Sequence, residues 1–109
     1  LPIKIINLNN RALGMVKQWQ DMQYSGRYSS ILYEDSLPDF VKLAESYGHV
    51  GIKVEKFSDL NDAMEECFSL KDKLVFLDVL IDPDEHVYPM LEAGGSMAEM
   101  RISKKDRTF

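Results

Sequence analysis

Short apolar runs alternate along the chain with segments of helical periodicity. Residues 3–8 are rich in β-branched side chains and predict a strand buried on both faces, as in a parallel sheet. Residues 50–54 alternate in polarity and predict a second strand, and residues 74–81 form an apolar run interrupted only by Asp78. A buried carboxylate needs a polar partner, so we expect Asp78 either to find one or to face the edge of the sheet.

Three other segments carry apolar residues at spacings of three, four and seven, which is typical of one helix face. The first spans residues 13–22, and the second begins near residues 36–38, where Pro38 suits an early helical position. The third follows Ser58, a predicted cap, and covers residues 60–68. The order β-α-α-β-α-β predicts an α/β fold, with a partial parallel sheet of three strands, flanking helices and right-handed crossovers.

The sequence after Asp82 has no regular period and contains Pro83, Pro89 and a Gly-Gly pair. We therefore predict an α/β domain over residues 1–81 and an extended C-terminal arm over residues 82–109. Such a segment forms little local structure that could offset its ordering entropy. We expect Val87 and the apolar residues just after it to make few contacts with the domain.

Composition excludes several classes of function. The 109 residues carry a formal net charge of −5, which argues against nucleic-acid binding because no basic surplus neutralises phosphates. No apolar run approaches the roughly 20 residues of a membrane span. The single cysteine, Cys67, excludes an internal disulfide and a cysteine-based zinc site, and it is interpreted as an inert core residue. The chain opens at Leu1 directly into a predicted strand, as a piece of a longer protein would.

Candidate chemistry begins at Asn9-Asn10-Arg11, which follows the first predicted strand. Ligands of open α/β sheets bind beyond the carboxyl ends of the strands, and an Asn oxygen is a suitable Mg²⁺ ligand. The alternative is that both Asn residues only form a turn and cap the next helix. Met15 and Trp19 on that helix suit core packing, and His86 suits a structural or solvated role as well as acid–base chemistry.

Four blocks taken together resemble one enzyme family. They are residues 9–20 (Asn-Asn to Trp-Gln), residues 37–40 (Leu-Pro-Asp-Phe), residues 47–51 (Tyr-Gly-His-Val-Gly) and residues 85–90 (Glu-His-Val-Tyr-Pro-Met), the last followed by Gly94-Gly95. In order and spacing they resemble the C-terminal thiamine-diphosphate domain of acetohydroxyacid synthase, also called acetolactate synthase. The likeness is to the bacterial catalytic, or large, subunit.

The resemblance implies a transferase of branched-chain amino-acid biosynthesis (isoleucine, valine, leucine). That enzyme condenses pyruvate with a second pyruvate or with 2-ketobutyrate, using thiamine diphosphate and Mg²⁺. Its FAD would be bound outside this segment. The implied partners are the rest of the large subunit, a homodimer or tetramer of large subunits and a small regulatory subunit, in the bacterial cytoplasm.

The resemblance also assigns residues around the cofactor. Asn10 would be a side-chain ligand of Mg²⁺, and Ala12 would offer its backbone carbonyl to the same ion. Gly14 and Met15 would lie at the cofactor. The Gly-Asp-Gly motif that supplies another Mg²⁺ ligand in the family is absent from this sequence.

Two further residues of the same block match positions that line a substrate and inhibitor channel in the family. Val16 and Trp19 would line it, and the arm would close over the active site. The resemblance places no catalytic residue in this segment, because the family's catalytic Glu belongs to the N-terminal domain of a neighbouring subunit. The isolated chain is therefore predicted to be inactive. The alternative is a free-standing α/β module that binds a phosphate or contacts another subunit.

Overall fold

Three parallel strands form one sheet in the computed structural model, which describes residues 1–33 and 35–103. They are β1 (Lys4–Asn9), β2 (Val50–Val54) and β3 (Val75–Leu80), in the order β1-β3-β2. The register places Asn7 of β1 and Lys53 of β2 on either side of Asp78 in β3. The predicted α/β fold with a three-stranded parallel sheet is confirmed.

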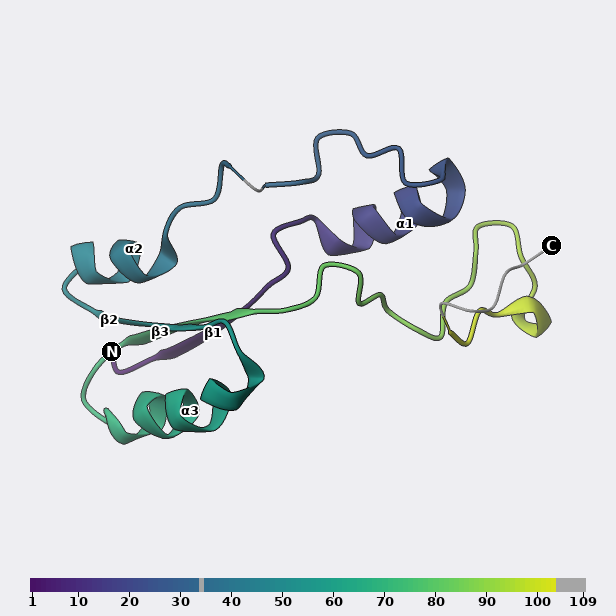
Figure 1. Cartoon of the computed structure of the whole chain (residues 1–109). Coiled ribbons are helices and arrows are strands. Elements are labelled where there is room, and N and C mark those ends of the chain that lie inside the picture. The colour runs from purple at the N-terminus through teal and green to yellow at the C-terminus, as the bar shows by residue number, and fades with distance from the viewer. Residues whose placement is uncertain (34, 104–109) are drawn as a thin grey trace.

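Helices cover both faces of this sheet. α2 (Phe40–Ser46) lies on one face and α3 (Leu60–Ser69) on the other (Figure 1). Right-handed connections that cross a sheet in opposite directions place their helices on opposite faces, which accounts for this arrangement. Two short 3₁₀ turns, η1 (Phe57–Asp59) and η2 (Met97–Glu99), complete the elements.

α1 (Gly14–Tyr24) stands apart from the sheet. It lies beyond the end of the strands, alongside the segment that leaves β3 (Figure 1). The molecule is accordingly elongated, with extents of 52 × 27 × 26 Å. None of the helices in the described part of the chain is long and apolar enough to cross a bilayer.

The hydrophobic core lies between the sheet and α3. Leu77 at its centre is fully buried and packs with Val54 of β2 and Ala63 of α3. Cys67, one turn further along α3, is also fully buried, as predicted for an inert core residue. Because side chains alternate across a strand, the neighbours of Leu77 point to the opposite face, where α2 lies.

On the α2 face the helix approaches β2 very closely. Phe40 stacks on Phe76 with ring centroids 5.4 Å apart. A Cβ added to Gly51 would lie 2.6 Å from Cα of Val41 and 2.7 Å from its carbonyl oxygen. Only glycine fits at this position, because the obstacle is the backbone of α2 and not a flexible side chain.

Gly51→Ala is therefore expected to destabilise the packing of α2 by about 1–3 kcal/mol, the usual cost of overpacking. In hydrogen exchange, the amides of α2 and β2 should exchange faster than in the wild type. Glu45→Ala, on the exposed side of the same helix, serves as the control. Equal exchange in Gly51→Ala and Glu45→Ala would contradict the close approach.

Two predicted helix starts are wrong. α2 begins at Phe40 and not near residues 36–38, because Asp39 provides the cap: its Oδ1 accepts a hydrogen bond from the Lys42 amide at 3.1 Å. Ser58 lies inside η1, and its hydroxyl donates to Asp59 Oδ1 at 2.7 Å instead of capping α3.

β1 is not buried on both faces, contrary to the prediction. Ile5, Ile6 and Leu8 are 40%, 42% and 64% exposed. The physical reason is that β1 is an edge strand: it pairs only with β3, and no helix of the described residues covers it. The apolar sequence of β1 is that of an inner strand, but in this chain its outer side remains open.

Candidate functional site

The turn that follows β1 is built by the two adjacent Asn side chains. Asn9 Oδ1 accepts a hydrogen bond from the Arg11 amide at 3.0 Å, and Asn10 Oδ1 accepts one from the Ala12 amide at 3.1 Å. Both are Asx turns, and Arg11, which lies within both, adopts a φ of +56°. The turn interpretation is confirmed, but the capping interpretation is wrong. The N-cap of α1 is Leu13, which has no side-chain cap.

Asn9 has a structural role because Asp78 holds it. Its Nδ2 donates to the two Asp78 carboxylate oxygens at 3.1 and 3.3 Å, and Asn7 Nδ2 donates to Oδ1 at 2.8 Å. Asp78 is only 4% exposed, so the expected polar partner for this carboxylate is present. Asn9 is thus held by Asp78 through its amide and by the Arg11 amide through its oxygen, which ties the turn to the sheet.

Asn10 differs from Asn9 because Gly14 makes room for it. A Cβ at Gly14 would lie 2.5 Å from Asn10 Nδ2, so the first residue of α1 must be glycine for this carboxamide to keep its place. Asn10 Oδ1 accepts one hydrogen bond and retains a second lone pair. The Ala12 carbonyl accepts no hydrogen bond from the residues that the structure describes.

These two oxygens suit a hard cation such as Mg²⁺, which prefers carboxylate, amide and carbonyl oxygens together with substrate phosphates. Two protein ligands do not complete an octahedral site. Within residues 1–33 and 35–103, no group of three His, Cys, Asp or Glu side chains could hold a metal ion. The remaining ligands of a Mg²⁺ ion would have to come from a bound cofactor and from elsewhere in the protein.

α1 presents its apolar side outward and its polar side inward. Met15 and Val16 are 48% and 43% exposed, and Trp19 is half-buried. The buried residues of the helix are Lys17 and Gln18, at 4% and 1% exposure. The core-packing interpretation is therefore wrong for Met15. The side of α1 that carries Met15, Val16 and Trp19 is open to a cofactor, a substrate or another part of a larger protein.

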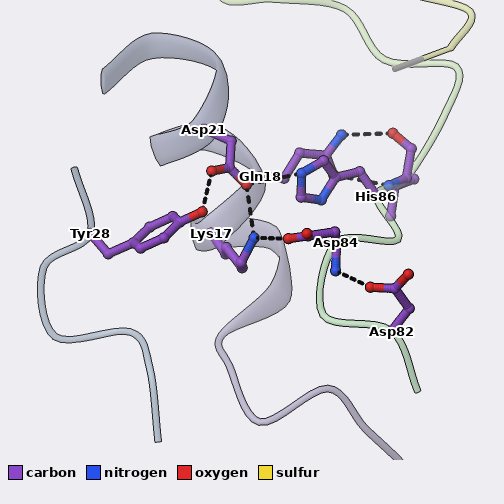
Figure 2. Close-up of polar contacts among 8 residues, drawn as sticks. Lys17, Gln18, Asp21, Tyr28, Asp82, Asp84 and His86 are labelled. Atoms are coloured by element: carbon purple, nitrogen blue, oxygen red, sulfur yellow. Dashed lines mark hydrogen bonds and ion pairs between the residues drawn. The ribbon is translucent and has the colours of Figure 1, made fainter. Parts of the chain in front are cut away.

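The inward side of α1 forms a polar cluster with the loop after α1 and with the segment after β3 (Figure 2). Lys17 Nζ lies 3.0 Å from Asp21 Oδ2 and 2.6 Å from Asp84 Oδ1. The same ammonium group lies 5.0 Å from the centre of the Tyr28 ring, and the Tyr28 hydroxyl donates to Asp21 Oδ1. One buried cation thus joins three segments of the chain.

Two further contacts fasten the segment after β3 to α1. Gln18 Nε2 donates to the Val87 carbonyl at 2.8 Å, and Gln18 Oε1 accepts from the Val87 amide at 3.0 Å. His86 Nε2 lies 3.0 Å from Asp21 Oδ2, and the His86 side chain is only 6% exposed, which supports its structural interpretation. The expectation of few contacts between the arm and the domain is therefore wrong for Val87. Residues 104–109 of the predicted arm lie outside the described residues.

The charges of this cluster stabilise each other. Burial lowers the pKa of Lys17, but its hydrogen bonds with Asp84, Tyr28 and Asp21 outweigh burial and hold the pKa above its ordinary value. Burial raises the pKa of Asp21, but hydrogen bonds from Tyr28 and Lys17 and the charge of Lys17 outweigh it, so this pKa lies below the ordinary 3.8. Both groups remain charged near neutral pH.

The arm should therefore loosen from α1 in acid. Because the Asp21 pKa is depressed, its stabilising contribution is full above pH 3.8 and is lost as pH falls through the lower, folded-state value. We expect hydrogen-exchange protection of residues 84–88 to fall below about pH 4, relative to β3. Asp21→Asn should flatten this pH dependence. Protection of residues 84–88 that follows β3 at every pH would contradict the prediction.

Little in the sequence pointed to this polar cluster. Lys17 and Asp21 are spaced like an ordinary surface pair, and only the gathering of apolar residues on the other side of α1 hinted at two distinct faces. Gln18 and Val87 are 69 positions apart, so no local pattern could connect them.

Comparison with known proteins identifies the family of this chain. Residues 1–79 match the family described as thiamine pyrophosphate enzyme, C-terminal TPP binding domain. The chain belongs to this family. Thiamine pyrophosphate is thiamine diphosphate, so the predicted cofactor is supported, and β1, α1, α2, β2 and α3 all lie inside the matched region.

The similar relatives are acetolactate synthase large subunits. The chain is 60% identical, over 95% of its length, to an acetolactate synthase large subunit of Haemophilus influenzae. It is 57% identical over 99% of its length to the acetolactate synthase isozyme 3 large subunit of Escherichia coli, and 38% identical to a large subunit of Corynebacterium glutamicum. The predicted resemblance is confirmed. The chain spans 18–19% of the length of these relatives.

Proposed function

We propose that this chain acts as the C-terminal part of the thiamine-diphosphate domain in an acetolactate synthase large subunit. The observation that carries the proposal is the identity of 57–60% with such subunits over nearly the whole chain. The geometry agrees, because the turn after β1 offers Asn10 and Ala12 oxygens at the carboxyl end of a parallel strand.

The proposed reaction condenses pyruvate with pyruvate or 2-ketobutyrate, the step that leads toward valine, leucine and isoleucine. Thiamine diphosphate, when bound, supplies the carbanion chemistry that the side chains of a protein cannot provide. The residues of this chain bind and orient. In this proposal none of them is catalytic, and the isolated chain is inactive.

Asn10 and Ala12 are proposed to hold the Mg²⁺ ion that anchors the diphosphate. Gly14 contributes by leaving space for the Asn10 carboxamide, and Met15, exposed on the first turn of α1, contacts the cofactor. Support for this assignment comes from the hydrogen bonds of the turn. Asp78 holds the Asn9 amide in a structural role, whereas Asn10 Oδ1 keeps a second lone pair and the Ala12 carbonyl accepts no bond from the described residues.

Val16 and Trp19 are proposed to line the channel that admits 2-ketoacids and inhibitors. Both lie on the outward, apolar side of α1, where nothing in the described part of the chain buries them fully. An apolar wall of this kind suits the alkyl group of a small ketoacid. A single methylene in such a pocket is typically worth about 1–3 kcal/mol of discrimination.

The open surfaces of this chain support its place in a larger assembly. The exposed Ile5, Ile6 and Leu8 of β1 and the uncovered side of α1 suit contacts with the rest of a large subunit. Binding of FAD outside this segment, assembly into a homodimer or tetramer with a small regulatory subunit, and a bacterial cytoplasmic location belong to the same proposal. A free-standing phosphate-binding or subunit-interaction module is less well supported, because it would leave these apolar surfaces in water.

The test is to assay the complete large subunit for acetolactate formed from pyruvate, with thiamine diphosphate and Mg²⁺ present. The isolated chain of 109 residues serves as the comparison. We expect product from the complete subunit and none from the isolated chain. Absence of acetolactate with the complete subunit would overturn the proposed function, and turnover by the isolated chain would overturn its predicted inactivity.

A further inference from the structure

The segment after β3 divides into two parts, which are held in different ways. Residues 90–101 form a loop closed on itself: Met90 and Arg101 exchange two backbone hydrogen bonds of 2.8 Å each. An ion pair between Arg101 and Glu92 supports the closure, and Ser96 and Glu99 form a capping box within the loop. Loops of this size with paired ends are compact units. Residues 84–87, which we call the root, connect this loop to the domain.

Gln18 holds the root in both position and orientation. Its carboxamide donates to the carbonyl and accepts from the amide of one residue, Val87, which is the pairing that one strand makes with another. Gln18 is only 1% exposed, so its carboxamide depends on Val87 for its hydrogen bonds. The neighbouring ion pair of Lys17 and Asp84 is less restrictive, because the Asp84 side chain is 58% exposed.

The chemistry of the position requires an amide. Glutamine carries a donor and an acceptor on one rigid group, whereas ionised glutamate only accepts and methionine does neither at comparable strength. An ionised carboxylate at position 18 would satisfy the Val87 amide and repel the Val87 carbonyl. Loss of either bond would leave a part-buried backbone group of Val87 without its partner, which costs free energy.

We propose that Gln18 is a positioning residue, which fixes the root to α1 and so holds the closed loop 90–101 beside the helix that carries Val16 and Trp19. The proposal rests on the proposed function for its catalytic consequence. Because Gln18 lies on the opposite side of α1 from Val16 and its carboxamide is bonded to Val87, it acts through the placement of the loop and not through contact with substrate. The ligand-facing side of α1 and the loop are thereby fixed relative to each other.

The test uses Gln18→Met in the complete subunit, with Asn61→Met on the exposed side of α3 as the control. Hydrogen exchange is measured for residues 84–101 and, as an internal reference, for β3. We expect exchange in residues 84–101 to rise about tenfold in Gln18→Met, as the loss of a buried hydrogen-bonded pair predicts, with β3 unchanged. Asn61→Met should match the wild type throughout.

Gln18→Glu gives a readout that a general loss of stability would not produce. A protonated glutamic acid donates and accepts like glutamine, so protection of residues 84–101 relative to wild type should return as pH is lowered. Other charged or ionisable side chains surround the root, and the wild type measured at each pH accounts for their contribution. They are Lys17, Asp21, Asp84, Glu85 and His86. For the enzyme, Gln18→Met should raise the KM for 2-ketoacid about fivefold and change kcat less than twofold.

Unchanged exchange in residues 84–101 of Gln18→Met would overturn the proposal, and so would an equal rise in β3, which would indicate only a structural role. A kcat loss with constant KM would overturn the catalytic consequence. These outcomes are separate from failure of the proposed function, which would appear as a wild-type subunit that forms no acetolactate while its root remains protected by Gln18.

Discussion

Asn10→Ala in the complete large subunit is expected to weaken binding of thiamine diphosphate with Mg²⁺ by at least about 100-fold. Outer partners of metal ligands are already worth 10–100-fold in affinity, and Asn10 is proposed to ligate the metal directly. The substitution removes the oxygen that now also accepts the Ala12 amide, so the turn that presents the Ala12 carbonyl loosens as well. Cofactor titration by calorimetry, together with acetolactate formation at saturating pyruvate, measures both effects.

Two further variants make the Asn10 prediction specific. Asn10→Asp keeps an oxygen in the same place and adds a charge that Mg²⁺ accepts, so its affinity should remain within about tenfold of wild type. Asn61→Ala, on the exposed side of α3, should change nothing. If Asn10→Ala bound the cofactor as tightly as Asn61→Ala does, Asn10 would not be a metal ligand.

Hydrophobic periodicity predicted the elements well wherever one element of this chain packs on another. The predicted strand over residues 74–81 is β3, and α3 turns its periodic side to Leu77 and Val54. The same kind of pattern led to wrong predictions of burial for β1 and for Met15 on α1. Periodicity identifies residues that share a face, but it does not say whether this chain or another part of a larger protein covers that face.

The polar contacts could not be predicted from the sequence, for a different reason. Lys17 and Asp84 are 67 positions apart, and Gln18 and Val87 are 69 apart, so no spacing rule connects them. The predicted starts of two helices were also wrong, by small shifts along the chain. Asp39 and Ser58 are both suitable caps by residue type, and only the path of the backbone decides that Asp39 caps a helix while Ser58 does not.

Residue type and position pointed to the turn after β1 as a candidate site, but only the family resemblance singled out Asn10 from Asn9. Their difference comes from tertiary neighbours. Asp78 on the adjacent strand holds Asn9, while Gly14 on the following helix makes room for Asn10. Asp78 was expected to need a partner, and its partners Asn7 and Asn9 follow from the register of β1 on β3. The sheet therefore holds the start of the turn at Asn9, and the oxygens of Asn10 and Ala12 that are proposed as ligands follow it.

Gly14→Ala tests this separation of roles because its two effects have opposite signs. In a helix, alanine is favoured over glycine by up to about 1 kcal/mol, so the stability of α1 should not fall. The new Cβ, however, would lie 2.5 Å from Asn10 Nδ2 and must displace the carboxamide. We expect the affinity for thiamine diphosphate with Mg²⁺ to fall about 10–100-fold, as for loss of an orienting partner of a ligand.

A double-mutant cycle with Asn10→Ala decides whether Gly14→Ala acts through Asn10. With alanine at position 10 the carboxamide that the new Cβ would strike is gone, so the second substitution should add almost nothing to the first. Calorimetric titration of the cofactor against the wild type, both single variants and the double variant gives the coupling. Thermal melting of the same four proteins checks that α1 has kept its stability. Additive losses of affinity would show that Gly14 serves the cofactor by another route, for instance by letting it approach the backbone of α1, and that Asn10 does not depend on the space that Gly14 leaves.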